Sequence, residues 1–223
     1  MTIALSSHQD KVAVLTSKRK RFACDIVSKA AVLDERVESR LVRAFCDVPR
    51  EVFLDRRFGV RAFDDVSLPI GFEQVVHRPS HMARLLSLLR VEKSHQILEI
   101  GTGSGYSAAL LSTLGARVFS VERIGLLAQK TRRTLDGHGF ANVMIKTMNG
   151  LYGWNDEAPF DSILSWVAFR DVPKRWKDDI RQNGGRIVVP LELSEGQRLC
   201  LFESQGGDLR RIVLEKSAFP LAS

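Results

Sequence analysis

The chain has 223 residues, 44% of them hydrophobic, and a formal net charge of +7. This length and composition allow one large core and exclude a globally disordered protein. No apolar run approaches the ~18 residues that cross a bilayer, so we expect no membrane span, and the start of the chain lacks the pattern of a secretory signal. The basic residues are spread out apart from Lys18–Arg21 and three arginine pairs, which is only weak support for a nucleic-acid partner.

The three cysteines, Cys24, Cys46 and Cys200, are scattered and odd in number. Their spacing fits neither a metal site nor a disulfide framework. We therefore expect small buried thiols, no bound metal, and a reducing cytoplasm as the place where the protein works.

Residues 1–60 are expected to form a helical extension in front of a single globular domain over 61–223. Asp34 is an expected N-cap, because the apolar residues that follow it recur at helical spacing and Pro49 ends the pattern. These apolar positions are Val37, Leu41, Phe45 and Val48.

Residues 62–79 contain two prolines and a glycine and have little periodicity, which predicts a long loop with short extended pieces. Loops of this kind commonly carry binding residues. Ser80 is then the expected N-cap of a helix whose apolar positions are Met82, Leu85, Leu86 and Leu89.

From His95 onward, strand-like and helix-like patterns alternate, which predicts an α/β fold with a mostly parallel sheet covered by helices. The expected strands lie at 95–101, 116–122, 142–147, 160–168 and 186–191, and the expected helices at 105–115, 125–138 and 173–182. The tail differs, because two strand-like runs flank the turn Gln205–Asp208. They predict an antiparallel hairpin at the edge of the sheet.

A glycine-rich turn, Gly101-Thr102-Gly103-Ser104-Gly105, follows the buried strand ILEI. Glycines let the backbone turn tightly and let a ligand approach the chain closely. Glu122 ends the next strand, where a carboxylate accepts hydrogen bonds from the hydroxyls of a ribose. The pattern predicts a nucleotide-like cofactor at this turn, and a tight turn without a ligand is the alternative.

The spacing distinguishes two cofactor classes. Dinucleotide enzymes usually have G-x-G-x-x-G, whereas here Tyr106 follows Gly105 directly. Glu99 stands two residues before Gly101, and a carboxylate there suits the sulfonium and the ammonium of S-adenosylmethionine. E-x-G-x-G-x-G therefore favours S-adenosylmethionine over a dinucleotide.

With these motifs in view, residues 43–221 resemble the protein-L-isoaspartate O-methyltransferase family, which has a class I methyltransferase Rossmann-like fold. The similarity rests on DVPREVF, on AFDDVSLPIG with Phe63 where a tyrosine is common, and on ILEIGTGSGY, SVERI, APFDSI, NGGRIVVP and FPL. The resemblance implies a seven-stranded sheet whose final strand is antiparallel. It also implies methyl transfer from S-adenosylmethionine to the side-chain carboxylate of L-isoaspartyl residues in damaged proteins or peptides.

The cofactor-binding residues that we expect from the motifs and the resemblance fall into three groups. They are Glu99 and the turn that follows it (Gly101, Thr102, Gly103, Ser104, Gly105, Tyr106), the pair Glu122 and Arg123, and the pair Asn149 and Gly150. In the last pair the asparagine replaces the aspartate of the family pattern, and its amide oxygen still accepts a hydrogen bond from an adenine amino group.

Two departures lie in the acceptor region. His77-Arg78-Pro79 replaces the family's S-x-P, whose serine is thought to be catalytic, and Trp166 stands in a run that is usually small. His77 is the expected catalytic residue, because a ring N–H can hold the acceptor carboxylate. Arg78 is expected to help as a fork-shaped partner if it points inward. A neutral imidazole can also remove a proton from a hydroxyl, thiol or amide acceptor. A changed methyl acceptor is therefore the alternative.

Three other functions remain open. A diverged methyltransferase of the same fold would act on a different carboxylate or on a small molecule. A nucleic-acid methyltransferase is disfavoured, because the fourth strand ends in Ser165-Trp166-Val167-Ala168 and lacks the N/D-P-P-Y/F motif that amino-methylating nucleic-acid enzymes have there. A binding module would keep the cofactor site without the chemistry. The sequence predicts no oligomeric state.

Overall fold

The computed structural model describes residues 8–115 and 117–222. Residues 1–7 of the expected helical extension lie outside the described residues, as does Ala116, the first residue of the strand expected at 116–122. None of the helices in the described part of the chain is long and apolar enough to cross a membrane.

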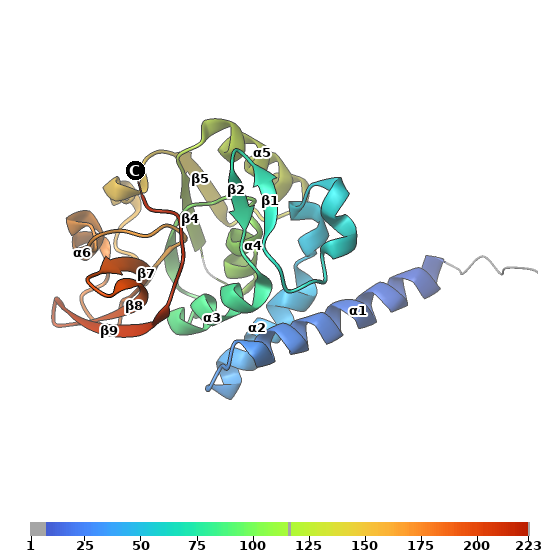
Figure 1. Cartoon of the computed structure of the whole chain (residues 1–223), viewed down its shortest axis with the longest axis horizontal. Helices are drawn as coiled ribbons and strands as arrows, with labels where there is room; N and C mark the ends of the chain where they lie inside the picture. The colour runs from blue at the N-terminus through green and yellow to red at the C-terminus, as the bar shows by residue number, and fades with distance from the viewer. Residues whose placement is uncertain (1–7, 116, 223) are drawn as a thin grey trace, which may run out of the picture.

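A seven-stranded sheet with the strand order β5-β4-β3-β6-β7-β8-β9 forms the centre of the molecule (Figure 1). The first five strands in this order are parallel, and β8 and β9 are antiparallel to their neighbours. Their bounds are β3 Gln96–Ile100, β4 Arg117–Glu122, β5 Val143–Thr147, β6 Ser162–Ser165, β7 Arg186–Leu193, β8 Gly196–Gln205 and β9 Asp208–Lys216. The expected mostly parallel sheet with a C-terminal antiparallel hairpin is confirmed.

Two hydrophobic clusters cover the two faces of the sheet. One packs the sheet against α3 (Pro79–Leu89), α4 (Tyr106–Thr113) and α5 (Gly125–Gly137), and the other packs it against α6 (Lys174–Asp179). Side chains alternate along a strand, so in β3 Ile97 belongs to the first cluster and Leu98 to the second. This alternation decides on which face of the sheet each side chain of β3 lies.

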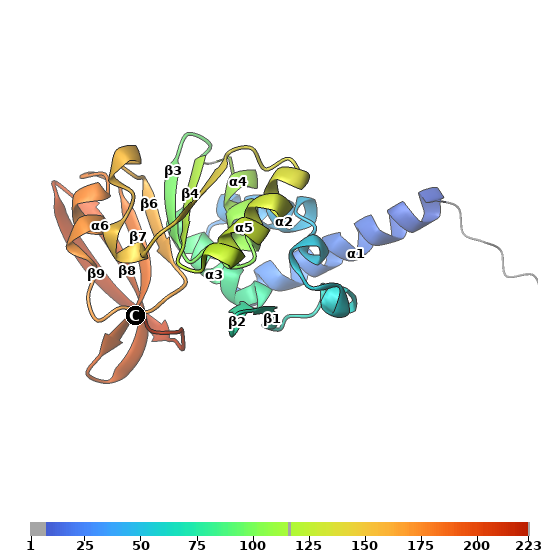
Figure 2. The ribbon, with the colours of Figure 1, turned by 90° about the horizontal axis from the view of Figure 1, so that it is seen from above.

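An N-terminal layer, α1 (His8–Lys29) and α2 (Glu35–Asp47), packs under α3 and α4. Asp34 caps α2 as expected, because its Oδ1 accepts hydrogen bonds from the backbone N–H of Arg36 at 2.9 Å and of Val37 at 3.3 Å. The first half of α1 extends away from the rest of the molecule (Figures 1 and 2). The two helices share one hydrophobic cluster with α4, and the domain boundary at residue 60 stays a prediction.

The segment between α2 and α3 contains two short 3₁₀ helices and a hairpin. The 3₁₀ helices are Arg50–Phe53 and Arg56–Arg61, and the hairpin pairs β1 (Leu68–Gly71) with β2 (Gln74–Val76). Helix α3 begins at Pro79, whose fixed φ and missing N–H suit the first helical position. The expected Ser80 cap is therefore wrong: Arg78 is the cap residue, and the Ser80 backbone N–H donates to Asp65 Oδ1 at 2.9 Å.

Candidate active site

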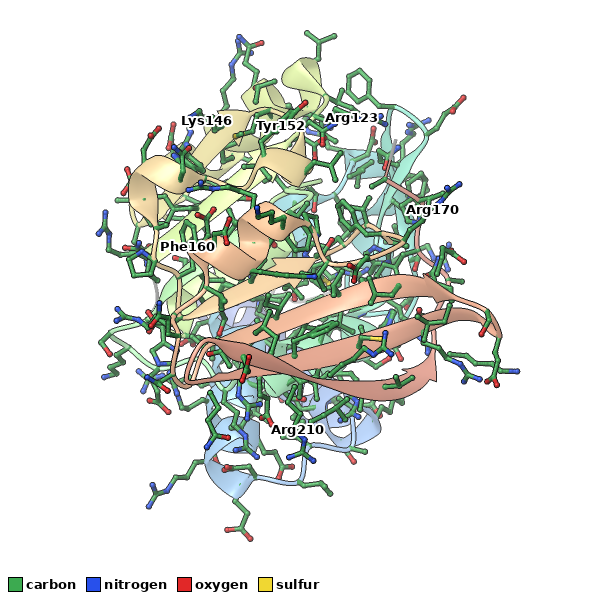
Figure 3. The ribbon with its side chains drawn as sticks, turned by 90° about the vertical axis from the view of Figure 1, so that its left-hand side faces the viewer. Arg123, Lys146, Tyr152, Phe160, Arg170 and Arg210 are labelled. Carbon is green, nitrogen blue, oxygen red and sulfur yellow. The ribbon has the colours of Figure 1, made fainter. Side chains whose placement is uncertain are left out.

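A cavity of about 270 Å³ lies at the carboxyl ends of the parallel strands, where α/β sheets commonly bind ligands. Figure 3 shows Arg123, which follows β4, and Arg170, which follows β6, on the side of the molecule that carries the β1–β2 hairpin, whereas Phe160, before β6, lies on the opposite side. Six segments and three single residues form the wall: Glu73–His77, Ile100–Ser104, Val121–Ile124, Met148–Gly150, Trp166–Val167 and Pro220–Ala222, with Met82, Ser107 and Phe169.

The glycine turn after β3 forms one wall of the cavity. Gly101 and Gly103 line it with φ values of 92° and 55°, a left-handed conformation that favours glycine. Gly105 is not part of the wall. A Cβ at Gly105 would lie 2.6 Å from Thr131 Cγ2, so this glycine lets the turn pack closely on α5. The Thr131 hydroxyl donates to the Gly103 carbonyl at 2.6 Å and fixes the turn there.

Glu122 lies at the end of β4 and faces the cavity, with only 7% of its surface exposed. Its Oε2 accepts from the Gly103 backbone N–H at 3.0 Å, and its Oε1 accepts from the Ile124 N–H at 2.9 Å. An ionised carboxylate has about four lone-pair directions, so both oxygens keep capacity for ligand hydroxyls. This arrangement suits the ribose that the sequence predicts.

Glu99 does not line the cavity, which corrects its expected contact with the sulfonium or ammonium of a cofactor. The side chain is fully buried on the α4 face of β3, and burial raises its pKa to about 6. It accepts hydrogen bonds from three other side chains: the Ser107 hydroxyl, the Ser120 hydroxyl at 2.6 Å and the Trp166 indole Nε1–H at 3.0 Å. Because side chains alternate along a strand, Glu99 faces α4, as Ile97 does.

Two more expected site residues lie outside the cavity wall. Tyr106 is fully buried under the N-terminal layer, with its ring 5.6 Å from the ring of Phe53, and burial raises its pKa. Arg78 is exposed, and its backbone N–H donates to Ser67 Oγ at 3.1 Å. The condition that Arg78 points inward is therefore not met, and Tyr106 contributes packing instead of a cofactor contact.

The end of β5 brings Asn149 and Gly150 to the cavity wall, beside Arg123 of the neighbouring strand end. Asn149 Oδ1 accepts from the Leu151 backbone N–H at 3.0 Å. A Cβ at Gly150 would lie 2.3 Å from Ile100 Cγ2, so the close approach to β3 requires a glycine. Thr102 and Ser104 complete the set of expected cofactor residues that the structure brings together.

His77 lines the cavity from the segment before α3. Its ring stacks on the Trp166 indole, with centroids 5.1 Å apart and an interplanar angle of 24°, and it contacts the Phe219 ring at 4.9 Å. Burial, and to a smaller extent the nearby His81, lower the pKa of His77 to about 4. The imidazole is therefore neutral at pH 7, with one N–H donor and one acceptor nitrogen.

The sequence did not predict several wall residues, among them Ser107, Met148 and the tail Pro220–Ala222. Hydrogen bonds at 2.8 Å link the Ala168 N–H to the Pro220 carbonyl and the Ala222 N–H to the Ala168 carbonyl, and they draw the tail to the cavity. The FPL motif at the end of the chain was the one available signal. It gave no indication of where the tail packs, because the contact joins residues more than 50 positions apart.

Comparison with known proteins gives a consistent picture. The model of the family described as protein-L-isoaspartate(D-aspartate) O-methyltransferase matches residues 24–221. A protein-L-isoaspartate O-methyltransferase from Geobacter metallireducens is 44% identical over 154 residues, which are 69% of this chain and 71% of that protein. Another from Chromobacterium violaceum is 36% identical over 220 residues, which are 98% and 96% of the two chains.

Solved structures share the fold. A protein-L-isoaspartate O-methyltransferase superimposes with a TM-score of 0.81 and 28% identity, over 92% of this chain and 66% of that one. A putative protein-L-isoaspartate O-methyltransferase from Plasmodium falciparum, solved with S-adenosyl-L-homocysteine, gives a TM-score of 0.78 at 17% identity, over 92% and 98% of the two chains. The class I methyltransferase architecture that the sequence predicts is confirmed.

Proposed function

The chain belongs to the protein-L-isoaspartate(D-aspartate) O-methyltransferase family, and from that premise we propose that it transfers the methyl group of S-adenosylmethionine to the side-chain carboxylate of L-isoaspartyl residues in proteins or peptides. One observation carries the proposal. One cavity is lined both by Gly101–Ser104, Glu122 and Asn149, which we call the cofactor end, and by His77 and Trp166, which we call the acceptor end. Donor and acceptor therefore meet in one space.

The cofactor end fits S-adenosylmethionine. Gly101 and Gly103 expose backbone to the cavity, the Glu122 carboxylate stands where a ribose needs acceptors, and the Asn149 amide lies beside them. When bound, S-adenosylmethionine supplies an electrophilic methyl group on a sulfonium sulfur. The Plasmodium falciparum relative was solved with the demethylated product of that cofactor.

At the acceptor end the protein must position a carboxylate and keep water away from it. A carboxylic acid with a pKa of about 4 is already ionised at neutral pH, so it needs no general base. The neutral His77 ring donates one N–H to a carboxylate oxygen and leaves the other oxygen free to react. The indole of Trp166, 6% exposed, keeps this end apolar and restricts access of water.

The test is methyl transfer from labelled S-adenosylmethionine to a short isoaspartyl peptide beside its normal aspartyl twin. We expect transfer to the isoaspartyl peptide alone. Calorimetry with S-adenosyl-L-homocysteine, run on the same preparation, shows whether the cofactor end is intact. Cofactor binding without transfer to the isoaspartyl peptide would overturn the proposal.

A second candidate is methylation of a different carboxylate, in a specific peptide or protein or in a small molecule. It is favoured by one observation: the Trp166 indole, stacked on His77, stands at the acceptor end, where the resemblance predicts small residues. The same assay with aspartyl peptides and small carboxylic acids as acceptors separates the two candidates, because only the second predicts transfer to these compounds.

We propose the cytoplasm as the place of this reaction. All three cysteines, Cys24, Cys46 and Cys200, are free thiols, which suits a reducing compartment. The partner that we propose is a protein or peptide substrate. Separately, the described residues contain no group of histidines, cysteines and carboxylates that would hold a metal ion.

A further inference from the structure

We propose that Trp166 is a positioning residue for this reaction: its indole, anchored on Glu99, holds the imidazole of His77 in the orientation that meets the acceptor carboxylate. The inference rests on the proposed function for its chemical meaning. The inference concerns how His77 is held, so one of its tests does not depend on methyl transfer by the protein.

The indole of Trp166 is fixed from several sides. Its backbone N–H donates to the Ile100 carbonyl at 3.0 Å, which keeps the residue beside the end of β3 after β6 has finished. Its Nε1–H lies 3.0 Å from Glu99 Oε1 and 2.9 Å from Ser107 Oγ. Because a buried N–H without an acceptor is costly, rotating the ring away from this pair is unfavourable.

Glu99 is a firm anchor because other groups hold it. The Ser107 hydroxyl of α4 and the Ser120 hydroxyl of β4 both donate to its carboxylate, and Ser120 Oγ is also 2.6 Å from Thr102 Oγ1 of the glycine turn. Glu99 is fully buried and does not line the cavity. Its carboxylate therefore binds side chains of α4 and β4. Its hydrogen bond with the Trp166 indole links these elements to the acceptor end.

His77, in contrast, depends on packing for its orientation. It lies between β2 and α3 in a segment without regular secondary structure, and neither ring nitrogen is hydrogen-bonded to any residue that the structure describes. The stack on Trp166 at 5.1 Å and the tilted contact with Phe219 at 4.9 Å hold the ring. A stack of this kind favours one orientation by about threefold to tenfold. A third ring, His81, contacts the imidazole edge-on at 6.1 Å, and of the three partners the indole is the one fixed by hydrogen bonds.

The first test follows the His77 ring protons by NMR in the wild type and in Trp166→Phe and Trp166→Ala, with His77→Ser used for assignment. The indole ring current shifts the resonances of a stacked imidazole. We expect a clear change of the His77 resonances in both variants and a larger one in Trp166→Ala. Unchanged His77 resonances in a folded Trp166→Phe protein would overturn the proposal.

The second test is a double-mutant cycle on methyl transfer to the isoaspartyl peptide. We expect Trp166→Phe to lower kcat by about tenfold when His77 is present and by less than about twofold in the His77→Ser background, where there is no imidazole to position. Serine keeps an O–H donor, so the background retains the chemistry. A role of Trp166 that is only structural would give the same factor in both backgrounds, and that result would contradict the proposal.

Trp176→Phe is the matched control. Trp176 is also a buried tryptophan, and its Nε1–H donates to the Gly150 carbonyl at 2.8 Å, at the cofactor end. We expect Trp176→Phe to change kcat by the same factor in the wild-type background and in the His77→Ser background, because Trp176 does not touch the imidazole. A factor that differed between the two backgrounds as much as that of Trp166→Phe would show that the coupling is not specific to the stack, and it would overturn the positioning role.

The two proposals fail in different ways. If the wild type binds cofactor but does not methylate the isoaspartyl peptide, the proposed function is wrong, and the NMR comparison alone decides how His77 is held. If the wild type is active and the cycle is additive, the positioning role is wrong and the proposed function stands.

Discussion

Glu122 at the cofactor end and His77 at the acceptor end are held in different ways. Glu122 is fixed by hydrogen bonds from the backbone N–H groups of Gly103 and Ile124. His77 is instead held by ring contacts, among them those with Trp166 and Phe219, which are distant in sequence. The first arrangement depends on backbone geometry and tolerates little change. The second depends on side-chain packing, so it can change its shape, and its substrate, without loss of the fold.

The largest effect is expected from a test of the backbone geometry. Gly105→Ala places a Cβ 2.6 Å from Thr131 Cγ2 at a φ of 85°, so strain and overpacking together cost about 3–4 kcal/mol of unfolding free energy. Denaturant unfolding measures the loss. Gly139→Ala is the control, with a φ of 79° and no neighbour within 4 Å of the added Cβ, and we expect about 1 kcal/mol there. Equal losses would show that the contact with α5 does not constrain the turn.

Glu122→Ala tests the cofactor end directly. It removes the acceptors of the Gly103 and Ile124 N–H groups together with those expected for the ribose, so we expect the affinity for S-adenosyl-L-homocysteine to fall by about 100-fold. Calorimetry measures the change. Glu99→Gln is the comparison, because Glu99 does not line the cavity, and its effect on cofactor affinity is expected to be smaller. An unchanged affinity in Glu122→Ala would remove the assignment of the cofactor end.

His77→Ala is expected to show that the two ends are separable. Loss of one hydrogen bond from a neutral N–H to the acceptor should lower kcat by about tenfold, while the affinity for S-adenosyl-L-homocysteine stays within about twofold. Steady-state kinetics and calorimetry on one preparation give both values. A cofactor affinity that falls together with kcat would mean that the two ends are one cooperative unit.

The difference between the two ends also explains what could be predicted from the sequence. The alternating strands and helices, the C-terminal hairpin and the Asp34 cap follow from local patterns, and all are confirmed. Gly101–Ser104 of the glycine turn and Glu122 line the cavity, and a local sequence motif was enough to predict them. The motif did not say which face of β3 carries Glu99, and it placed Tyr106 at the cofactor although the start of α4 turns that ring toward the N-terminal layer.

The acceptor end was harder to predict, because it is made by contacts between separate segments. His77 and Trp166 each stood out as departures from the family pattern, but their stacking depends on how the segment before α3 packs against the end of β6. Phe219 comes from the tail, which reaches the site through its backbone pairing with Ala168. No local periodicity carries this information.

The smallest expected effect is a pH dependence of stability that originates at the acceptor end. The folded pKa of His77, about 4, lies below the ordinary value of 6.5, so between these values the unfolded chain binds more protons and stability falls as the pH falls. Burial has the opposite effect at Glu99, whose pKa is raised to about 6, so its contribution to stability falls as the pH rises from 4.5 to 6. Comparing wild type with His77→Phe isolates the contribution of His77 to the pH dependence of stability, because Glu99 is present in both. We expect the unfolding free energy of the wild type to decrease, relative to that of the variant, as the pH is lowered from 7.5 to 5. An NMR titration of His77 with a midpoint near 6.5 would contradict this, and it would mean that the ring is more accessible to water than its stack on Trp166 implies.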